Sequence, residues 1–572
     1  MLRTLLSRLK TYWNRFTGAE KKLLLVLFIV IFASLLFTKT YGRRYTTEMA
    51  KAGGSYTEGL IGQPRYINPL LAPASSVDMD LSRIVFSGLL KFDKNLNIAP
   101  DLAETLPVLS ANGREYMITL RENLVWPGRE DRKITADDVV FTFHAIQNPD
   151  YQSPLRLSWG KVTVEKIDER KIKITTAQAS ATFIANLTVG IIPKHIWENI
   201  PGSSFALSKY NIEPIGSGAF QVSKLKRNRA GNIVSMSFKA NKKYHLGAPY
   251  IENLNFKFYQ SSEELIEAYH GRDIDGLGSE PFDRSLFIEP KKNLLQEKLE
   301  LPQYQAVFIN EVKNPAPLGD ARVRLALAKS VDKKKIISTV YGDQSSTAYG
   351  PILPGHLGYH EQIPGAPMNI YDIDAAKKLL EESGWILDPS ASGGFRKDKQ
   401  NRVINLSLVT NDFTPNLRVS EALKQMWESI GIKISLTIVT RGELEEKYIR
   451  SRNYELLLFS ENVGPDPDPY PFWHSSQRRD PGLNLTTFAN AQADKLLAEA
   501  RGNLSPSDRA ARYKQFQEIF VGSVPAIFLS RGSYVYNITS EVKGLDLKTV
   551  VTPADRFNNV NEWYIETKRI KK

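Results

Sequence analysis

Apolar and polar residues alternate with two different periods in the C-terminal half of the chain. Ile404, Leu406 and Leu408 are apolar at every second position, which predicts a strand with one buried face. Leu423 and Trp427 lie four positions apart, within a pattern that predicts an amphipathic helix. Together these patterns predict a strand at 404–408, a helix at 416–430, a strand at 432–438, a helix at 442–451 and a strand at 454–459. This order predicts an α/β unit with a parallel sheet and right-handed crossovers.

The same reasoning predicts elements in the rest of the 572 residues. Helices are expected to begin after Thr135, Asp320 and Asp332, because side chains of these types accept hydrogen bonds from the first helical turn. The last of these helices is expected to end at Gly342. Strands are predicted at 115–120, 171–175, 251–258 and 304–309. A chain of this length has room for several domains.

Residues 23–37 form an apolar run of fifteen residues without a charged side chain. The run falls somewhat short of the ~30 Å hydrocarbon core, but Thr38 and the flanking Lys22 and Lys39 can extend it. A cleaved signal peptide is the alternative, but the residues after the run make a poor cleavage site. We therefore expect an uncleaved transmembrane anchor at residues 23–38.

Composition and charge agree with a membrane partner. Residues 1–44 carry nine Lys and Arg against one acidic residue, whereas the rest of the chain carries 66 basic and 61 acidic residues. The positive charge therefore flanks the apolar run, which favours a membrane over nucleic acid. Six of these basic residues precede the run and three follow it, so the basic segment 1–22 is expected in the cytoplasm and the large domain outside. The chain has no cysteine, which excludes disulfides, thiolate nucleophiles and a lipid-modified cysteine.

A proline-rich acidic loop follows the apolar strand at 454–459. Gly464 and three prolines in 464–469 prevent a helix or a central strand from continuing. Ligands of open α/β sheets bind outside the carboxyl ends of strands, so this loop is a candidate ligand site. A solvated surface loop, with its aromatic residues in the core, is the alternative. The candidate residues here are Asp466, Asp468, Tyr470, Phe472 and Trp473.

An ordered series of short motifs runs through the chain from residue 56 onward. Each motif is weak alone, but their order and spacing resemble those of the family 5 extracellular solute-binding proteins, the peptide-binding subunits of bacterial ABC importers. The motifs are FSGLLKFD at 86–93, PDLAE at 100–104, LRENLVW at 120–126, TADDV at 135–139, GSGAF at 216–220, NKKY at 241–244, GAP at 247–249, DARVRLAL at 320–327, AKKLL at 376–380, GW at 384–385 and DPDP at 466–469.

The resemblance implies an α/β fold with two lobes that close like a clamp, of the periplasmic-binding-protein type. The first lobe is expected to be discontinuous and to contain an extra subdomain. The expected organisation is a tether at 39–55, lobe I at 56–300 with an inserted subdomain at about 83–211, lobe II at 301–530, and a C-terminal segment at 531–572 that completes lobe I.

The resemblance also implies a function. Such proteins hold a ligand between the lobes, and hinge closure engulfs it. We expect a monomeric, extracytoplasmic protein without a cofactor that captures peptides or a similar small solute and delivers them to an ABC transporter permease. A receptor of the same fold that signals to a membrane partner is the alternative. Relatives hold the peptide's amino group with an Asp of the acidic loop, a role that falls here to Asp466 or Asp468. Glu58 and Asn68 are further candidates for the cleft.

Neither catalysis nor metal binding is expected. Ser475 and Ser476 beside His474 are the local candidates for a nucleophile and base, but adjacency in sequence is not the geometry that catalysis requires. His356 and His360 are four residues apart, but a glycine between them and a Pro-Gly pair before them make a metal-binding helix improbable.

Overall fold

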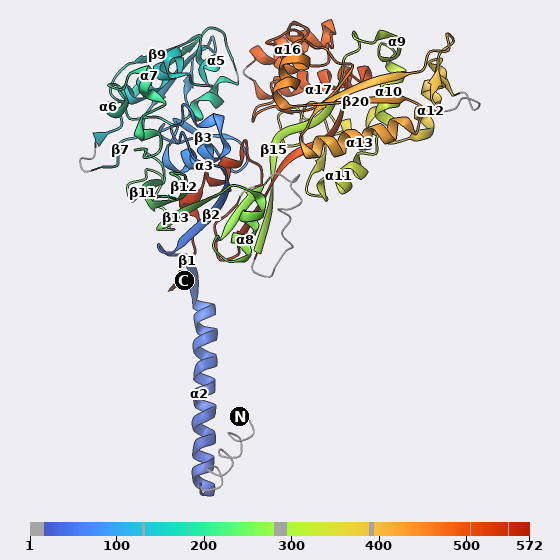
Figure 1. Ribbon diagram of the computed structural model, residues 1–572. Helices are drawn as coiled ribbons and strands as arrows, with labels where there is room; N and C mark the ends of the chain where they lie inside the picture. Colours follow the sequence, from blue (N-terminus) through green and yellow to red (C-terminus); the bar gives the residue numbers. More distant parts are fainter. Residues whose placement is uncertain are drawn as a thin grey trace.

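The computed structural model describes residues 16–128, 132–180, 182–279, 294–387, 394–503, 505–546 and 548–571, without the side chains of residues 35–45. Most of the predicted basic segment 1–22, and the side chains at the end of the predicted anchor, therefore lie outside the described residues. Figure 1 shows two lobes joined by long strands, and one helix, α2 (Gly18–Tyr45), that projects away from both.

One sheet of 11 strands passes through both lobes, in the order β11-β12-β13-β2-β14-β22-β15-β21-β19-β20 with β16 beside β22. On the side of lobe I are β11 (Phe220–Arg227), β12 (Ile233–Ala240), β13 (Asn253–Tyr259), β2 (Ser55–Ile61) and β14 (Gly276–Ser279). On the side of lobe II are β16 (Ser346–Thr347), β21 (Leu456–Asn462), β19 (Asn405–Asn411) and β20 (Lys433–Val439). The two strands between them, β15 (Leu294–Ile309) and β22 (Ala526–Thr539), belong to both lobes.

β15 and β22 form the connection between the lobes (Figure 1). They pair antiparallel: the first half of β15 pairs with residues 533–539, and its second half pairs with residues 526–531 and with β21. The register shifts twice along this ribbon, between Glu300 and Tyr304 and between Gln305 and Ala306. Such shifts interrupt the ladder and bend the strands, so the crossing between the lobes has a defined bend.

Separate hydrophobic cores lie on the two sides of this bend. One core joins residues from the range 56–301 with residues from 534–563. Two others draw only on residues between 304 and 529. The lobe boundaries at residues 300 and 530 stay predictions, and this division of the cores supports them.

The predicted α/β unit of lobe II is confirmed. β19 is parallel to both β20 and β21, and α13 (Thr414–Glu428) connects β19 to β20. Leu423 and Trp427 of α13 are fully buried. Gly431 has a φ of +87°, which lets the chain turn sharply after the helix. The predicted helix at 442–451 is a short α14 (Arg441–Glu443) followed by a π-helical turn, η8 (Leu444–Ile449).

The remaining helices of lobe II follow the expected caps. Asp320 caps α10 (Ala321–Lys329), and Asp332 caps α11 (Lys333–Tyr341), which ends at Gly342 in a left-handed conformation. α12 (Ile373–Glu382) packs on α10, and α16 (Ala491–Gly502) packs on α17 (Pro506–Ser523).

Lobe I contains a second, smaller sheet within the predicted inserted subdomain. Its order is β5-β6-β10-β9, formed by Val108–Leu109, Glu115–Thr119, Lys171–Thr176 and Val162–Lys166. α4 (Ala136–Gln147) packs on it and begins with the predicted capping box of Thr135 and Asp138. α3 (Ser76–Val85) precedes α4 in the chain, and the short α5 (Arg156–Trp159) follows it.

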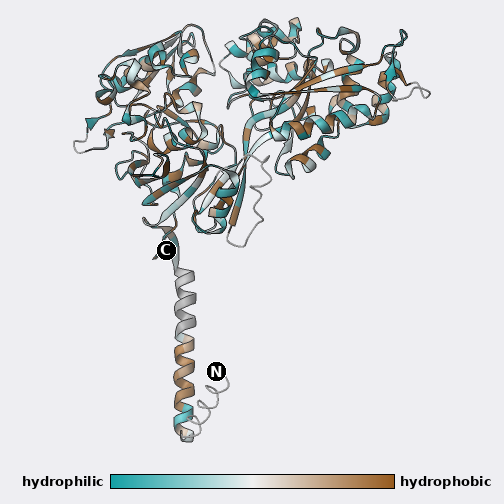
Figure 2. Ribbon diagram, viewed as in Figure 1, coloured by the Kyte–Doolittle hydropathy of each residue, from teal (hydrophilic) through white to brown (hydrophobic). Residues whose placement is uncertain are grey.

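α2 stands apart from the lobes. Figure 2 shows a hydrophobic stretch along it, where large apolar side chains between Leu23 and Phe32 are exposed. Within the described part of the chain, no helix has both the length and the apolarity needed to cross a membrane. The transmembrane anchor expected at residues 23–38 is therefore not supported by the structure. After α2, β1 (Thr46–Ala50) pairs with the C-terminal strand β23 (Thr567–Lys571).

Candidate functional site

Both carboxylates of the acidic loop have arginine partners. The loop follows β21 and leads into the short α15 (Tyr470–Trp473). Asp466 accepts hydrogen bonds from both terminal nitrogens of Arg509 on α17, with Nη1 at 3.0 Å. Asp468 is paired with Nε of Arg501 on α16 at 3.1 Å, and burial raises the pKa of Asp468 while Arg501 opposes that shift. These pairs fasten the loop to two helices of lobe II.

The two pairs differ in how freely the arginine can move. The Arg509 side chain is 6% exposed, so it is fixed in the interior. The Arg501 side chain is 44% exposed and lies over the ring of Tyr470. A ligand ammonium group could therefore replace Arg501 at Asp468 far more easily than it could replace Arg509 at Asp466.

The aromatic residues of this segment have different surroundings. Trp473 is 1% exposed and packs against Phe308 and Phe520, so it is a core residue. Tyr470 and Phe472 are partly buried against the same core. The structure thus keeps only these two of the three aromatic rings near the surface.

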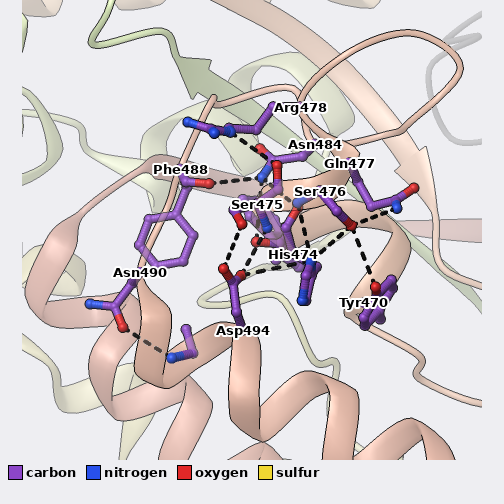
Figure 3. A network of polar contacts seen from close by, with 12 residues as sticks. Tyr470, His474, Ser475, Ser476, Gln477, Arg478, Asn484, Phe488, Asn490 and Asp494 are labelled. Atoms are coloured by element: carbon purple, nitrogen blue, oxygen red, sulfur yellow. Dashed lines mark hydrogen bonds and ion pairs between the residues drawn. The ribbon is translucent and has the colours of Figure 1, made fainter.

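His474, Ser475 and Ser476 form a polar network with Asp494 rather than a catalytic triad (Figure 3). The Ser475 hydroxyl donates to Asp494, not to the histidine. Nδ1 of His474 accepts the backbone N–H of Ser476 at 3.1 Å and lies 3.9 Å from Asp494. A triad needs serine and aspartate on different imidazole nitrogens, whereas here one nitrogen faces both groups.

Glu58 and Asn68 lie in the core of lobe I, and both are 0% exposed. Glu58 accepts hydrogen bonds from Tyr536 at 2.8 Å and from Arg556 at 2.9 Å. Asn68 uses its side-chain oxygen to accept the backbone N–H of Leu70 at 3.0 Å, which holds a turn. Their present contacts are structural, and their role as ligand contacts stays a prediction.

A cavity of about 750 Å³ lies at the bend between the lobes. Its walls come from β15, β22, the carboxyl end of β19 and the start of α13. The cavity thus lies at the carboxyl end of the strand β19, and ligands of open α/β sheets bind outside the carboxyl ends of strands. Polar and charged side chains that line it include Gln303, Gln305, Asn411, Asp412, Arg441, Ser460, Ser530 and Arg531.

A chain of hydrogen bonds fixes one wall of this cavity. The Tyr341 hydroxyl donates to Gln305 at 2.9 Å, Gln305 donates to Asn416 at 2.8 Å, and Asn416 donates to Asn411 at 2.7 Å. These hydrogen bonds connect α11, β15, α13 and the end of β19. Because each amide is oriented by the next, the wall presents fixed polar groups to whatever enters.

Sequence reasoning did not find this cavity. Its lining comes from segments far apart in the chain, and none of them carries a motif of its own. Gln303, Gln305, Ser530 and Arg531 lie inside long strands, where a polar residue is indistinguishable by pattern from one on a solvated face.

Among the described residues, no cluster of His, Asp and Glu suits a metal ion, and burial lowers the pKa of His356 to about 4.

Glu461, at the end of β21, is a buried carboxyl group close to the acidic loop. It is 6% exposed, and the Tyr304 hydroxyl donates a hydrogen bond to it at 2.7 Å. Burial raises the pKa of Glu461 to about 8. The ordinary pKa of a glutamate, 4.5, applies in the unfolded state, so between pH 4.5 and pH 8 the folded state holds a proton on Glu461 that the unfolded state has lost. The free energy of unfolding therefore falls as the pH rises through this range.

Glu461→Gln should remove this pH dependence, because glutamine still accepts the Tyr304 hydrogen bond but does not titrate. We expect the variant to be more stable than the wild type by about 2–4 kcal/mol at pH 8.5 and nearly equal to it at pH 4.5. Urea unfolding at both pH values measures the difference, with the exposed Glu446→Gln as the control. Equal stabilities of Glu461→Gln and the wild type at pH 8.5 would show that the fold does not raise the pKa of Glu461.

Comparisons with known proteins agree with the two-lobed architecture. The oligopeptide-binding protein AppA of Bacillus subtilis is 26% identical over 514 residues, which covers 88% of this chain and 91% of the relative. The solved structure of that oligopeptide-binding protein with a nonapeptide has a TM-score of 0.68 at 24% identity, covering 91% of this chain and 100% of the other. The ABC transporter substrate-binding protein CtaP of Listeria monocytogenes has a TM-score of 0.74 at 24% identity, covering 90% and 100%.

The family model for bacterial extracellular solute-binding proteins, family 5 (middle region), matches residues 97–482. This match covers more than half of the chain and includes most of the motifs that carried the resemblance. It also includes part of lobe I, the strand β15 that connects the two lobes, and the acidic loop. The chain therefore belongs to the family 5 bacterial extracellular solute-binding proteins.

Proposed function

We propose that this protein captures peptides, or a similar small polar solute, between its lobes and delivers them to an ABC transporter permease. The observation that carries the proposal is the polar cavity at the bend of the two strands that join the lobes. Membership of a solute-binding family supports it, as does the similarity to a curated oligopeptide-binding protein.

The chemistry of the cavity suits a peptide backbone. Its Asn, Gln and Ser side chains offer both donors and acceptors, which a backbone with alternating N–H and C=O groups needs. A volume of about 750 Å³ leaves room for bridging water, which lets one site accept different side chains. Binding and release by such a site need no chemical step, and we propose that the protein is not an enzyme.

Closure of the lobes is the expected consequence of binding. The lobes are joined by strands with two register shifts, so they can rotate about the bend while each core stays intact. We expect the radius of gyration to decrease when a saturating pool of synthetic peptides, two to nine residues long, is added, with unchanged helix content. Small-angle scattering and circular dichroism measure both quantities. An unchanged radius at demonstrated saturation would contradict the clamp.

We also propose that the protein acts as a monomer outside the cytoplasm and is attached to the membrane through residues 23–38. The fifteen uncharged residues of the sequence support attachment. Membrane fractionation and sequencing of the mature N-terminus test it. A mature chain that begins near residue 40 would contradict the anchor.

A further inference from the structure

The strands β1 and β23 form a two-stranded ribbon between lobe I and α2 (Figure 1). Thr46, the first residue of β1, follows α2 directly and pairs with Lys571 of β23. An ion pair between Glu48 of β1 and Lys543, 3.3 Å apart, fastens the ribbon to the C-terminal segment of lobe I. The C-terminal strand is therefore held beside the end of α2.

The ribbon turns one face toward lobe I and exposes the other. Residues directly opposite each other in an antiparallel pair share a face, and faces alternate along each strand. Glu48 and Arg569 thus share the face that contacts Lys543. Met49 and Ile570 lie on the other face and are 45% and 39% exposed. Two strands alone bury little apolar surface, so this face favours a partner that covers it.

The charges of the ribbon favour an anionic partner. Lys568, on the exposed face, and Lys571, at the end next to α2, are both exposed, and within the described part of the chain no ion pair joins either of them to an acidic residue. Glu566, just before β23, is already paired with Lys51 at 2.6 Å. The sequence adds two arginines at 43–44, in the last turn of α2. Exposed apolar side chains among cations are typical of surfaces that contact anionic lipids.

The length of α2 brings the ribbon to the level of the lipid headgroups. In the proposed attachment residues 23–38 lie in the membrane, and residues 39–45 continue the helix for about 10 Å at 1.5 Å per residue. The headgroup layer on one side of a bilayer is roughly 5–8 Å thick. The ribbon therefore begins where the headgroups end, and Ile570 and Lys571 lie at the end nearest to them.

We propose that the ribbon of β1 and β23 is a contact surface for anionic lipid headgroups. Lys568 and Lys571 attract the headgroups, and Met49 and Ile570 enter the interface between headgroups and acyl chains. This inference rests on the proposed membrane attachment and adds a second contact to it. A helix alone lets the domain rotate about the helix axis, whereas a second contact at the C-terminal strand fixes which side of lobe I faces the membrane.

A fluorescence experiment with the full-length protein tests this contact. The chain has no cysteine, so Thr47→Cys carries a single fluorophore on the exposed face of the ribbon. The protein is reconstituted into vesicles of phosphatidylcholine, alone or with an equal part of phosphatidylglycerol, that contain a lipid with a nitroxide quencher on its headgroup. We expect the ratio of quenched to unquenched fluorophore to be about 25-fold higher with phosphatidylglycerol, because each cation near an anionic surface changes such a ratio by about fivefold.

The double variant Lys568→Gln with Lys571→Gln should lower the ratio in anionic vesicles to the value in phosphatidylcholine alone, with unchanged peptide binding. Met49→Ser gives a second, independent variant and should lower the ratio in both kinds of vesicle. The matched control is Lys334→Gln with Lys335→Gln, which removes two exposed cations from α11, away from the ribbon, and should keep the wild-type ratio (Figure 1).

The possible outcomes separate this inference from the proposals on which it rests. Equal ratios in the two kinds of vesicle, or an unchanged ratio in the double lysine variant, would overturn the inference and leave attachment and peptide capture standing. A protein that stays with neither kind of vesicle would overturn the attachment as well. Quenching that follows the ratio of protein to lipid, rather than the lipid charge, would assign the ribbon to a second copy of the chain and overturn the inference.

Discussion

Arg556→Met is expected to lower the free energy of unfolding by about 3–5 kcal/mol. Arg556 is 0% exposed and is paired with two buried carboxylates, Glu58 at 2.9 Å and Asp80 at 2.7 Å. Removing it leaves both carboxylates buried without their counter-ion, and that desolvation is far more costly than the pair is favourable. Methionine fills much of the same volume as arginine, so the loss of stability comes from the missing charge rather than from a new cavity.

The decrease in the free energy of unfolding caused by Arg556→Met should be smaller at acid pH. Burial raises the pKa values of Glu58 and Asp80, and Arg556 opposes both shifts. Without Arg556 the folded state takes up protons that the unfolded state does not, so the variant gains stability relative to the wild type as the pH falls.

Arg170→Met is the matched control for this variant. Arg170 also pairs with two carboxylates, Glu104 at 3.0 Å and Glu122 at 2.9 Å, but its side chain is 38% exposed. Its loss should change the free energy of unfolding by about 0–1 kcal/mol. Urea unfolding of both variants at pH 7 gives the comparison, and equal losses would show that burial does not govern the Arg556 network.

Asp468→Asn is expected to abolish discrimination between a peptide with a free amino group and its N-acetylated form. The Arg501 side chain is 44% exposed and can turn into water, so a ligand ammonium group can take its place at Asp468. Truncating one partner of such a desolvated pair reduces affinity by roughly 30-fold to several-thousand-fold. Calorimetric titration with both peptide forms measures this loss.

Asp466→Asn serves as the internal control for Asp468→Asn. Its partner Arg509 is 6% exposed and fixed in the core. We therefore expect Asp466→Asn to lower the free energy of unfolding by about 2–3 kcal/mol and to leave the preference for the free amine intact. If both variants distinguish the two peptide forms as the wild type does, neither residue is the amine receptor.

The part of the fold that depends on local periodicity could be predicted from the sequence. The parallel unit of β19, β20 and β21 follows from apolar spacing, and the helix starts at Thr135, Asp320 and Asp332 follow from side chains that cap their own helices. β15 was predicted only over residues 304–309. Its first half, Leu294 to Glu300, lacks a strict alternation because it pairs with β22 alone.

The site was predicted less well, for a different physical reason. The partners of Asp466 and Asp468 lie on helices that follow them in the chain, and two partners of Glu58, Tyr536 and Arg556, lie almost the whole chain length away. No spacing rule reports such pairs. Arg531 lines the cavity beside the register shifts between β15 and β22. Sequence patterns describe how an element folds, but here the packing of elements that are far apart in the chain decides which polar residues meet.

The most direct test of the central claim is to identify what the full-length protein binds. The protein is purified from its own cells, and native mass spectrometry then measures its mass before and after incubation with the mixed peptide pool. We predict bound peptides that are released on unfolding. A protein that retains no peptide or other small polar solute, and that takes up no peptide from the pool, would contradict the account.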